Sequence, residues 1–450
     1  MQKRKHQLSR SSAHDKQVSR RRRHMSWQKR AQIQILVMLA FFSISVGLWE
    51  NFRQLWLQKN GFTATEISNV TSLGTVVSVI GIILAGNFLR MRHLRVFMGC
   101  ILTSKVVFLA LLAVLNGSEL PGWITFCLVV DVVTTNLIVI SVYPLITTII
   151  KNNRVYSQRK LVEYLFRDIG VLIGSLLISQ RFSLIILSYN GCLAVSIAFL
   201  VIATILMFNL QARMTEREPS RRLSTFKYVK NYILKDRLQR VYMIYAYLAA
   251  TSFAAALGLK MLMLTNQLHF SVSVSTDFLL IVGLLSDIIG IAALKFFTPK
   301  NDYLTIFLKF GIRLLIFIAA IFSNDVFMML IAITWTLLSS TAYEDVSDGH
   351  YINVIPNHHQ FRYGTVKNVV TYLGEATGLL FAGWMYNYGI PHILAISAAF
   401  TLVQISVAYY LIYLRHHPRH RSKLAKFFKK PKKSPAISLP QTSPKQSRRG

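Results

Sequence analysis

The segment LSTFKYVKNYILKDRLQR, residues 223–240, belongs to the one long polar stretch that interrupts an otherwise apolar chain. The whole stretch covers about 210–240 and is rich in Lys and Arg. Apolar residues recur in it at helical spacing, at Leu223, Phe226, Val229 and Ile233. This spacing predicts an amphipathic helix on the membrane surface, with a solvated linker as the alternative. In either case the stretch divides the chain into two halves.

Long apolar runs fill both halves of the chain, which has 450 residues, 53% of them hydrophobic and 15% charged. A helix needs about 20 mostly apolar residues to cross a bilayer. Six runs of this kind precede the polar stretch, at about 32–56, 66–89, 95–115, 122–150, 161–179 and 183–209. Six more follow it, at about 241–264, 273–296, 303–322, 325–344, 363–386 and 391–414. The sequence therefore predicts an all-α polytopic membrane protein with 12 transmembrane helices in two bundles of six.

The basic residues lie mainly on one side of the predicted membrane. The chain has 51 Lys or Arg and 18 Asp or Glu, and the basic residues cluster in both tails, in the central stretch and in alternate loops. By the positive-inside rule, both tails and the central stretch are cytoplasmic, which agrees with an even number of spans. We therefore expect a multi-pass protein of the cell membrane whose basic tails attract anionic lipid. Nucleic acid is not an expected partner, because no stacking aromatic residues accompany the basic runs.

Five parts make up the predicted organisation. Basic, disordered N-terminal and C-terminal tails flank two six-helix bundles. A loop that contains the amphipathic helix joins the bundles. In chain order these parts cover residues 1–30, 31–209, 210–240, 241–415 and 416–450.

The motifs of cofactor and metal chemistry are missing from the sequence. Cys100, Cys127 and Cys192 all lie in apolar runs, without partners at metal-ligand spacing. The sequence contains no G-x-x-x-x-G-K-[ST] loop for a nucleotide and no H-E-x-x-H pairing. We therefore expect no cofactor, no metal site and no enzymatic activity.

The loop after the second predicted span carries a partial motif, GNFLRMRHLR, from Gly86 to Arg95. It resembles the G-x-x-x-D-x-x-G-R-[KR] loop of the major facilitator superfamily, with Gly86 and Arg95 in place and Arg90 instead of the Asp. Two six-span halves with cytoplasmic ends and a basic central loop resemble the same family, over about 32–414. The resemblance implies two bundles that alternate in access around a midplane cavity in a monomer. It also makes Gly86, Arg90 and Arg95 candidates for a gating loop.

Glycines recur in the second, fifth, eighth and eleventh predicted spans, where small residues let helix backbones approach closely. The resemblance implies that these four helices form the interface between the halves, so we expect the glycines to serve this interface. They are Gly74, Gly81, Gly86, Gly170, Gly174, Gly283, Gly290, Gly374, Gly378 and Gly383.

Charged residues inside the predicted spans are the candidates for a functional site. A charge at mid-membrane costs about 2.5–3.5 kcal/mol, so it normally faces a cavity or a partner. Asp131 and Glu375 lie mid-span and are too short to reach the surface, so they rank first. Lys260 is expected to extend toward the membrane surface, and Lys105, Lys309 and Arg313 are near enough to span ends, or long enough, to do likewise. The candidates for substrate binding or proton coupling are Glu50, Arg53, Asp131, Arg167, Asp168, Asp287 and Glu375.

Two of these candidates have a local alternative. Glu50 and Arg53 fall on one helical arc, which predicts a cavity site, although a local salt bridge is the alternative. Arg167 likewise is four residues beyond Glu163 and can form a local pair with it.

These observations favour a secondary transporter that moves a small molecule by alternating access, with protons as the coupling ion. Export of drug-like or lipophilic compounds is the favoured direction and substrate class. A sugar or glycolipid carrier or flippase is the first alternative. A membrane receptor or scaffold that recruits partners through its basic tails is the alternative from another class.

Overall fold

The computed structural model describes residues 2–88, 93–115, 120–149, 154–178, 189–210, 228–296, 307–353 and 357–416, and the regular elements in these ranges are all helices. The N-terminal bundle comprises α1 (Gln2–Lys59), α2 (Ala64–Phe88), α3 (Leu94–Val114), α4 (Pro121–Ile149), α5 (Arg154–Ile178) and α6 (Tyr189–Phe208). These helices occupy the positions of the first six predicted spans.

The C-terminal bundle repeats this pattern after the central loop. Its helices are α8 (Arg237–Leu257) with its continuation α9 (Lys260–Leu262) and η3 (Met263–Gln267), α10 (Val272–Phe296), η4 (Phe307–Gly311) with α12 (Ile312–Ser323), α13 (Val326–Asn353), α14 (Asn357–Met385) and α15 (Ile390–His416). Among the described residues, 8 helices are long and apolar enough to cross a membrane. The predicted all-α polytopic fold is confirmed.

The polar segments differ in part from the expectations. The helical segment α1 extends from the first predicted span back to Gln2, in the basic N-terminal part of the chain. In the central loop, residues 211–227 lie outside the described residues, and with them Leu223 and Phe226. The described end of the loop has helical turns at Tyr228 and in η2 (Val229–Ile233).

That short helix packs on the protein. Tyr228 and Ile233 are 3% and 4% exposed, and they belong to a hydrophobic cluster with Tyr242 of α8 and Tyr363 of α14. The central loop therefore ends as a helix held against the C-terminal bundle, where the sequence predicts one lying on the membrane surface.

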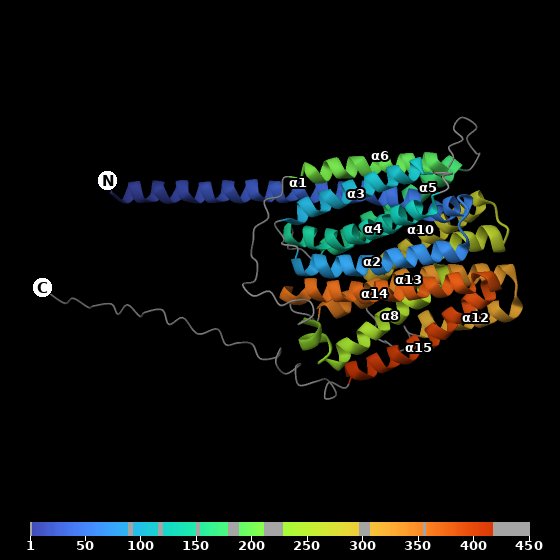
Figure 1. The fold of residues 1–450 in the computed structure, drawn as a ribbon. Helices are drawn as coiled ribbons and strands as arrows, with labels where there is room; N and C mark the ends of the chain where they lie inside the picture. Colours follow the sequence, from blue (N-terminus) through green and yellow to red (C-terminus); the bar gives the residue numbers. More distant parts are fainter. Residues whose placement is uncertain are drawn as a thin grey trace.

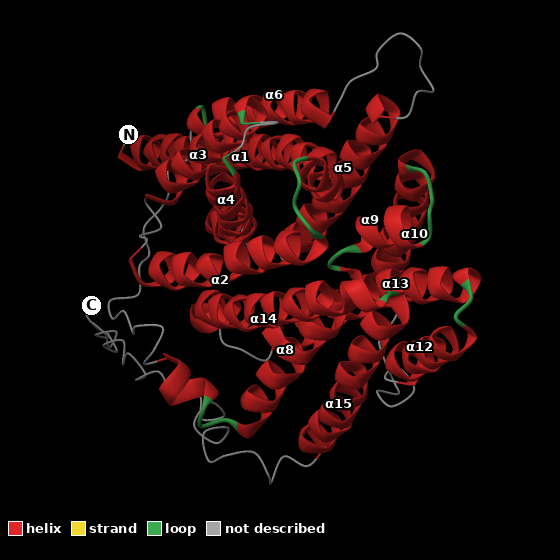
Figure 2. Ribbon diagram, turned by 45° about the vertical axis from the view of Figure 1, so that its right-hand side comes forward, coloured by secondary structure: helices red, strands yellow, loops and turns green. Residues whose placement is uncertain are grey.

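The two bundles meet along two pairs of helices. Figure 1 shows α2 of the N-terminal bundle and α14 of the C-terminal bundle side by side in the middle of the molecule. These two helices make extensive contact. Helix α5 packs against α10 in the same way, which Figure 2 shows from another side. The second, fifth, eighth and eleventh helices therefore form the interface between the bundles, as the resemblance implies.

Hydrogen bonds between the bundles lie toward one side of the molecule. Helix α1 begins and α15 ends at the left in Figure 1, and we call the opposite side the distal side. Hydrogen bonds to carbonyls of α14 come from Thr65 at 3.0 Å, from Ser72 at 2.9 Å and from Ser68. All three donors lie in the first turns of α2, which starts on the distal side.

Two further bonds support the same conclusion. Gln54, near the end of α1, donates to the Gly258 carbonyl at 2.7 Å, and Ser175, near the end of α5, donates to Asp277 Oδ1 at 2.9 Å. These bonds hold the bundles together in the distal half of the membrane.

Most of the expected interface glycines serve contacts inside one bundle. A Cβ on Gly170 of α5 would meet the Ile44 carbonyl of α1, and a Cβ on Gly374 of α14 would meet the Tyr247 carbonyl of α8. The glycines Gly74, Gly81, Gly174 and Gly378 also face helices of their own bundle. Gly283, against Asp168, and Gly383, against Ser68, do lie at the bundle interface. The prediction is therefore wrong for most of them, because α1 crosses α5, and α8 crosses α14, at backbone contact.

We expect Gly374→Ala to destabilise the fold by about 1–3 kcal/mol, because the added methyl group overlaps the Tyr247 backbone carbonyl, which cannot move aside as a side chain would. Thermal unfolding in detergent measures this loss. Gly122→Ala is the matched control, since a Cβ there meets nothing within 4 Å. Equal unfolding temperatures for the two variants would contradict the close crossing of α8 and α14.

Candidate functional site

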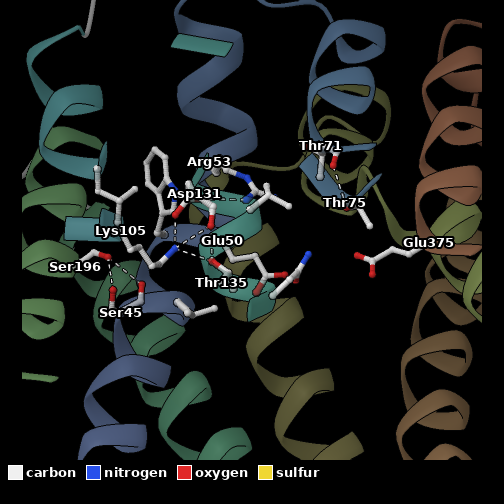
Figure 3. Close-up of a pocket in the computed structure, with 15 residues that line it drawn as sticks. Ser45, Glu50, Arg53, Thr71, Thr75, Lys105, Asp131, Thr135, Ser196 and Glu375 are labelled. Atoms are coloured by element: carbon white, nitrogen blue, oxygen red, sulfur yellow. Dashed lines mark hydrogen bonds and ion pairs between the residues drawn. The ribbon is translucent and has the colours of Figure 1, made fainter. Parts of the chain in front are cut away.

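A cavity that is open to solvent lies between the bundles (Figure 3). Most of its lining residues are charged or carry a hydroxyl or amide group: Ser45, Glu50, Arg53, Thr71, Thr75, Lys105, Asp131, Thr135, Asn136, Ser196 and Glu375. Val46, Trp49, Leu109 and Val132 complete the lining. Among these described residues, Glu375 comes from the C-terminal bundle, and the others come from the N-terminal bundle.

Asp131 of α4 is paired with two cations and one ring N–H. Lys105 of α3 forms an ion pair with its Oδ1, and the Arg53 guanidinium of α1 lies 3.5 Å from its Oδ2. Trp49 donates its indole N–H to the same Oδ2 at 3.1 Å. Asp131 is 1% exposed, so its charge is balanced inside the N-terminal bundle, where it joins α1, α3 and α4.

Lys105 is as deeply buried as its partner, with 2% of the residue exposed. Its ammonium group also donates to Thr135 Oγ1 at 2.6 Å. The expectation that Lys105 extends toward the membrane surface is therefore wrong. A carboxylate on the neighbouring helix satisfies the charge more closely than distant headgroups can.

Glu50 differs from Asp131 because it is exposed in the cavity, into which it points in Figure 3. Four cations interact electrostatically with its carboxylate: Arg167, Lys260, Arg53 and Lys105. Two of these come from α5 and α9, so the carboxylate belongs to a network wider than a local pair with Arg53. Lys260 is half-buried in this network, whereas the sequence predicts that it extends to the membrane surface.

Glu375 is the contribution of α14 to the cavity. It is half-buried, and Figure 3 shows it on the side opposite the cluster of Arg53 and Asp131. The cavity is therefore lined by carboxylates from both bundles. They include Asp131 and Glu375, the two candidates that rank first from the sequence.

The remaining candidates lie where α5 packs against α10. Asp168 and Asp287 are buried there, with 5% and 8% of each residue exposed, and Arg167 beside them is exposed. Glu163, the possible local partner of Arg167, forms an ion pair with Arg159 at 3.4 Å. Arg167 interacts electrostatically with Glu50 and with both aspartates. It therefore connects this group of charges to the cavity.

The C-terminal bundle has a counterpart of the N-terminal cluster in which the described partners of the cation are hydroxyl groups. Arg313 of α12 is 2% exposed and donates to Ser252 Oγ at 2.8 Å and to Ser397 Oγ at 3.3 Å. These serines join α8 to α15, as the 2.7 Å contact of Ser45 with Ser196 joins α1 to α6. The third helix of each bundle thus carries a buried cation, but the cation of the second bundle faces hydroxyl groups. The expectation that Arg313 reaches the surface is also wrong.

The gating-loop candidates are described only in part. Gly86 lies in the last turn of α2, and Arg90 lies outside the described residues. Arg95 donates to the Phe208 carbonyl, so it ties α3 to α6 within the N-terminal bundle. Within the described ranges, no three His, Cys, Asp or Glu side chains group as metal ligands would.

Comparisons with known proteins agree with this geometry at the level of the fold. No protein-family model matches the chain, and no curated protein sequence matches it. Solved structures do match. The nucleoside transporter NupG superposes with a TM-score of 0.63 at 12% identity, over 85% of this chain and 99% of NupG.

Two further solved structures are similar to the chain. A bacterial homologue of the human lysosomal transporter Spinster, in an inward-facing and unoccupied conformation, has a TM-score of 0.62 at 12% identity, over 86% of this chain and 97% of its own. The fucose:proton symporter FucP of E. coli has a TM-score of 0.58 at 13% identity, over 84% of this chain and 98% of its own.

Proposed function

We propose that this chain, which has the fold of the major facilitator superfamily, is a secondary transporter that moves a small polar solute across a membrane by alternating access, coupled to protons. The observation that carries the proposal is the polar cavity between the bundles, with Glu50, Arg53 and Glu375 in its lining.

The lining supports a polar solute more than a lipophilic one. Binding sites for lipophilic ligands are lined mainly by apolar and aromatic groups, with few polar ones. Here the lining has hydroxyl and amide groups in addition to its charges, from Thr71, Thr75, Thr135 and Asn136. Such groups hydrogen-bond the hydroxyls of a solute such as a sugar or a nucleoside. The first alternative from the sequence, a carrier of sugar-like molecules, is therefore the one we adopt.

The bundle contacts support an assignment of the conformational state. Hydrogen bonds join α2 to α14, and α5 to α10, in the distal half. The positive-inside rule places the opposite side, with both chain ends and the central loop, in the cytoplasm. We therefore assign the structure to an inward-facing state of a multi-pass protein of the cell membrane, and the Spinster homologue that superposes on it has that conformation.

Glu50 is the proposed coupling carboxylate. A coupling group must exchange its proton with water, and Glu50 is exposed in the cavity, whereas Asp131 is buried in an ion pair with Lys105. Protonation of Glu50 would leave the surrounding cations less balanced, which changes the relative stability of the two access states. The proposed roles are solute and proton binding for Glu50, Arg53 and Glu375, and positioning for Asp131.

Transport in proteoliposomes tests the proposal directly. We expect a pH gradient of the correct sign to drive accumulation of at least one labelled hexose or nucleoside, and we expect a protonophore to abolish it. One proton per solute corresponds to about 1.4 kcal/mol, or tenfold accumulation, for each pH unit. Gradient-driven movement of a hydrophobic dye, with no movement of any polar solute, would instead support the lipophilic exporter.

A further inference from the structure

Two carboxyl groups from opposite bundles meet at the contact of α5 with α10. A side-chain hydrogen bond links Asp168 to Asp287, and both residues are more than nine-tenths buried, with 5% and 8% exposed. The packing agrees with this contact, because a Cβ on Gly283, one turn before Asp287, would lie 3.4 Å from Asp168 Oδ1. The Asp168 carboxyl group therefore lies against the face of α10 that carries Asp287.

A hydrogen bond between two carboxyl groups requires a proton on one of them, because an ionised carboxylate only accepts hydrogen bonds. With the proton, the pair carries one negative charge. Without it, two like charges share a site of low dielectric constant, and the two carboxylates repel each other. The other oxygen of Asp168, Oδ2, is buried with no hydrogen-bond partner among the described residues. A shared proton thus explains how these two side chains tolerate contact away from water.

The surrounding charges connect this pair to the solute cavity. Among the residues that the structure describes, the charged and titratable groups around the pair are Arg167 and Tyr164 on α5, Lys260 on α9 and Glu50 on α1. Within residues 326–339 of α13, which also packs on α10, no side chain is titratable. Because Arg167 and Lys260 interact with both Glu50 and Asp168, a change of charge in the cavity alters the balance at the pair.

We propose that Asp168 and Asp287 form a proton-binding site that holds α5 against α10 in this conformation. Loss of the shared proton leaves two carboxylates in contact and favours separation of the bundles on the distal side. The proton passes to the water that enters as the helices part, and no other reactant is needed. The inference rests on the proposed proton coupling and adds a second site to it, at the bundle contact.

Spin labels on the distal side test this proposal without any solute. Gln58, at the end of α1, and Tyr388, before α15, are exposed on opposite bundles and serve as Cys positions in a Cys100→Ser background. We expect the distance distribution in lipid nanodiscs to gain a longer component as the pH is raised. In Asp168→Asn and in Asp287→Asn this component should be absent at every pH, because an Asn amide donates to the remaining carboxylate without titrating.

Asp277→Asn is the matched control, because Asp277 accepts a hydrogen bond from Ser175 at the same helix contact. We expect this variant to keep the pH-dependent component. A component that persists in both pair variants, or that Asp277→Asn also removes, would overturn the proposal. Either variant of the pair that elutes as a monodisperse protein is sufficient for the test. A failure here leaves the transport assay unaffected, because the spin-label distances report only the bundle contact.

Discussion

Replacing Lys105 with Met is expected to destabilise the protein by about 3–5 kcal/mol, the largest stability effect that we predict for a single substitution. The change leaves Asp131, which is 1% exposed, without the cation that forms an ion pair with its Oδ1. The carboxylate then keeps only the more distant Arg53, 3.5 Å from its Oδ2, and this poorly balanced buried charge accounts for most of the loss. Thermal and denaturant unfolding in detergent measure it.

The double variant Lys105→Met with Asp131→Asn separates the charge from the packing. We expect it to recover most of the lost stability, because removal of both partners of a buried pair is often close to neutral. Lys59→Met is the control for loss of an exposed lysine, which lies 6.0 Å from the centre of the Tyr189 ring, and it should change stability by about 1 kcal/mol or less. If the double variant is no more stable than Lys105→Met alone, Lys105 stabilises the fold by something other than its ion pair with Asp131.

Glu50→Gln is expected to abolish uphill transport and to preserve exchange. If one proton per solute passes through this carboxylate, accumulation should fall from about tenfold for each pH unit to no accumulation at all. Counterflow of the same solute across the membrane should continue, because Gln keeps the shape and hydrogen-bonding capacity of the side chain. Paired measurements of gradient-driven accumulation and counterflow in proteoliposomes distinguish these outcomes.

Glu66→Gln is the control for that experiment. Glu66 is also an exposed carboxylate, but it accepts a hydrogen bond from the Thr63 backbone N–H at 2.8 Å at the start of α2, away from the cavity. We expect the Glu66→Gln variant to accumulate solute to the same ratio as the unmodified chain. Accumulation that remains tenfold per pH unit in Glu50→Gln would assign the coupling proton to another group.

The sequence predicts the positions of the helices well because the bilayer fixes them. The predicted span 273–296 and the observed helix α10, Val272–Phe296, differ by one residue at one end. The seventh span is different: the sequence predicts one run at 241–264, whereas the structure interrupts it at Gly258 and continues it as α9 and η3. Hydropathy does not reveal this break, because the residues beyond Gly258 are as apolar as those before it.

The partnerships within the site are predictable only where the partners share a helix. The spacing of three residues places Glu50 and Arg53 on one face, and the structure has both in the cavity lining. The partnership of Lys105 with Asp131 joins two helices, so no spacing within one helix indicates it. The partner of Glu163 illustrates the same limit, since Arg159 and Arg167 are each four residues away and spacing alone does not indicate the 3.4 Å ion pair with Arg159.

The uneven composition of the cavity has a consequence for the transport cycle. Because its lining comes from the N-terminal bundle except for Glu375, a bound solute would remain on the same surface while the C-terminal bundle moves past it. The solute would then meet nearly the same donors and acceptors whichever side of the membrane the cavity faces. Its dissociation constants on the two sides of the membrane would therefore be similar.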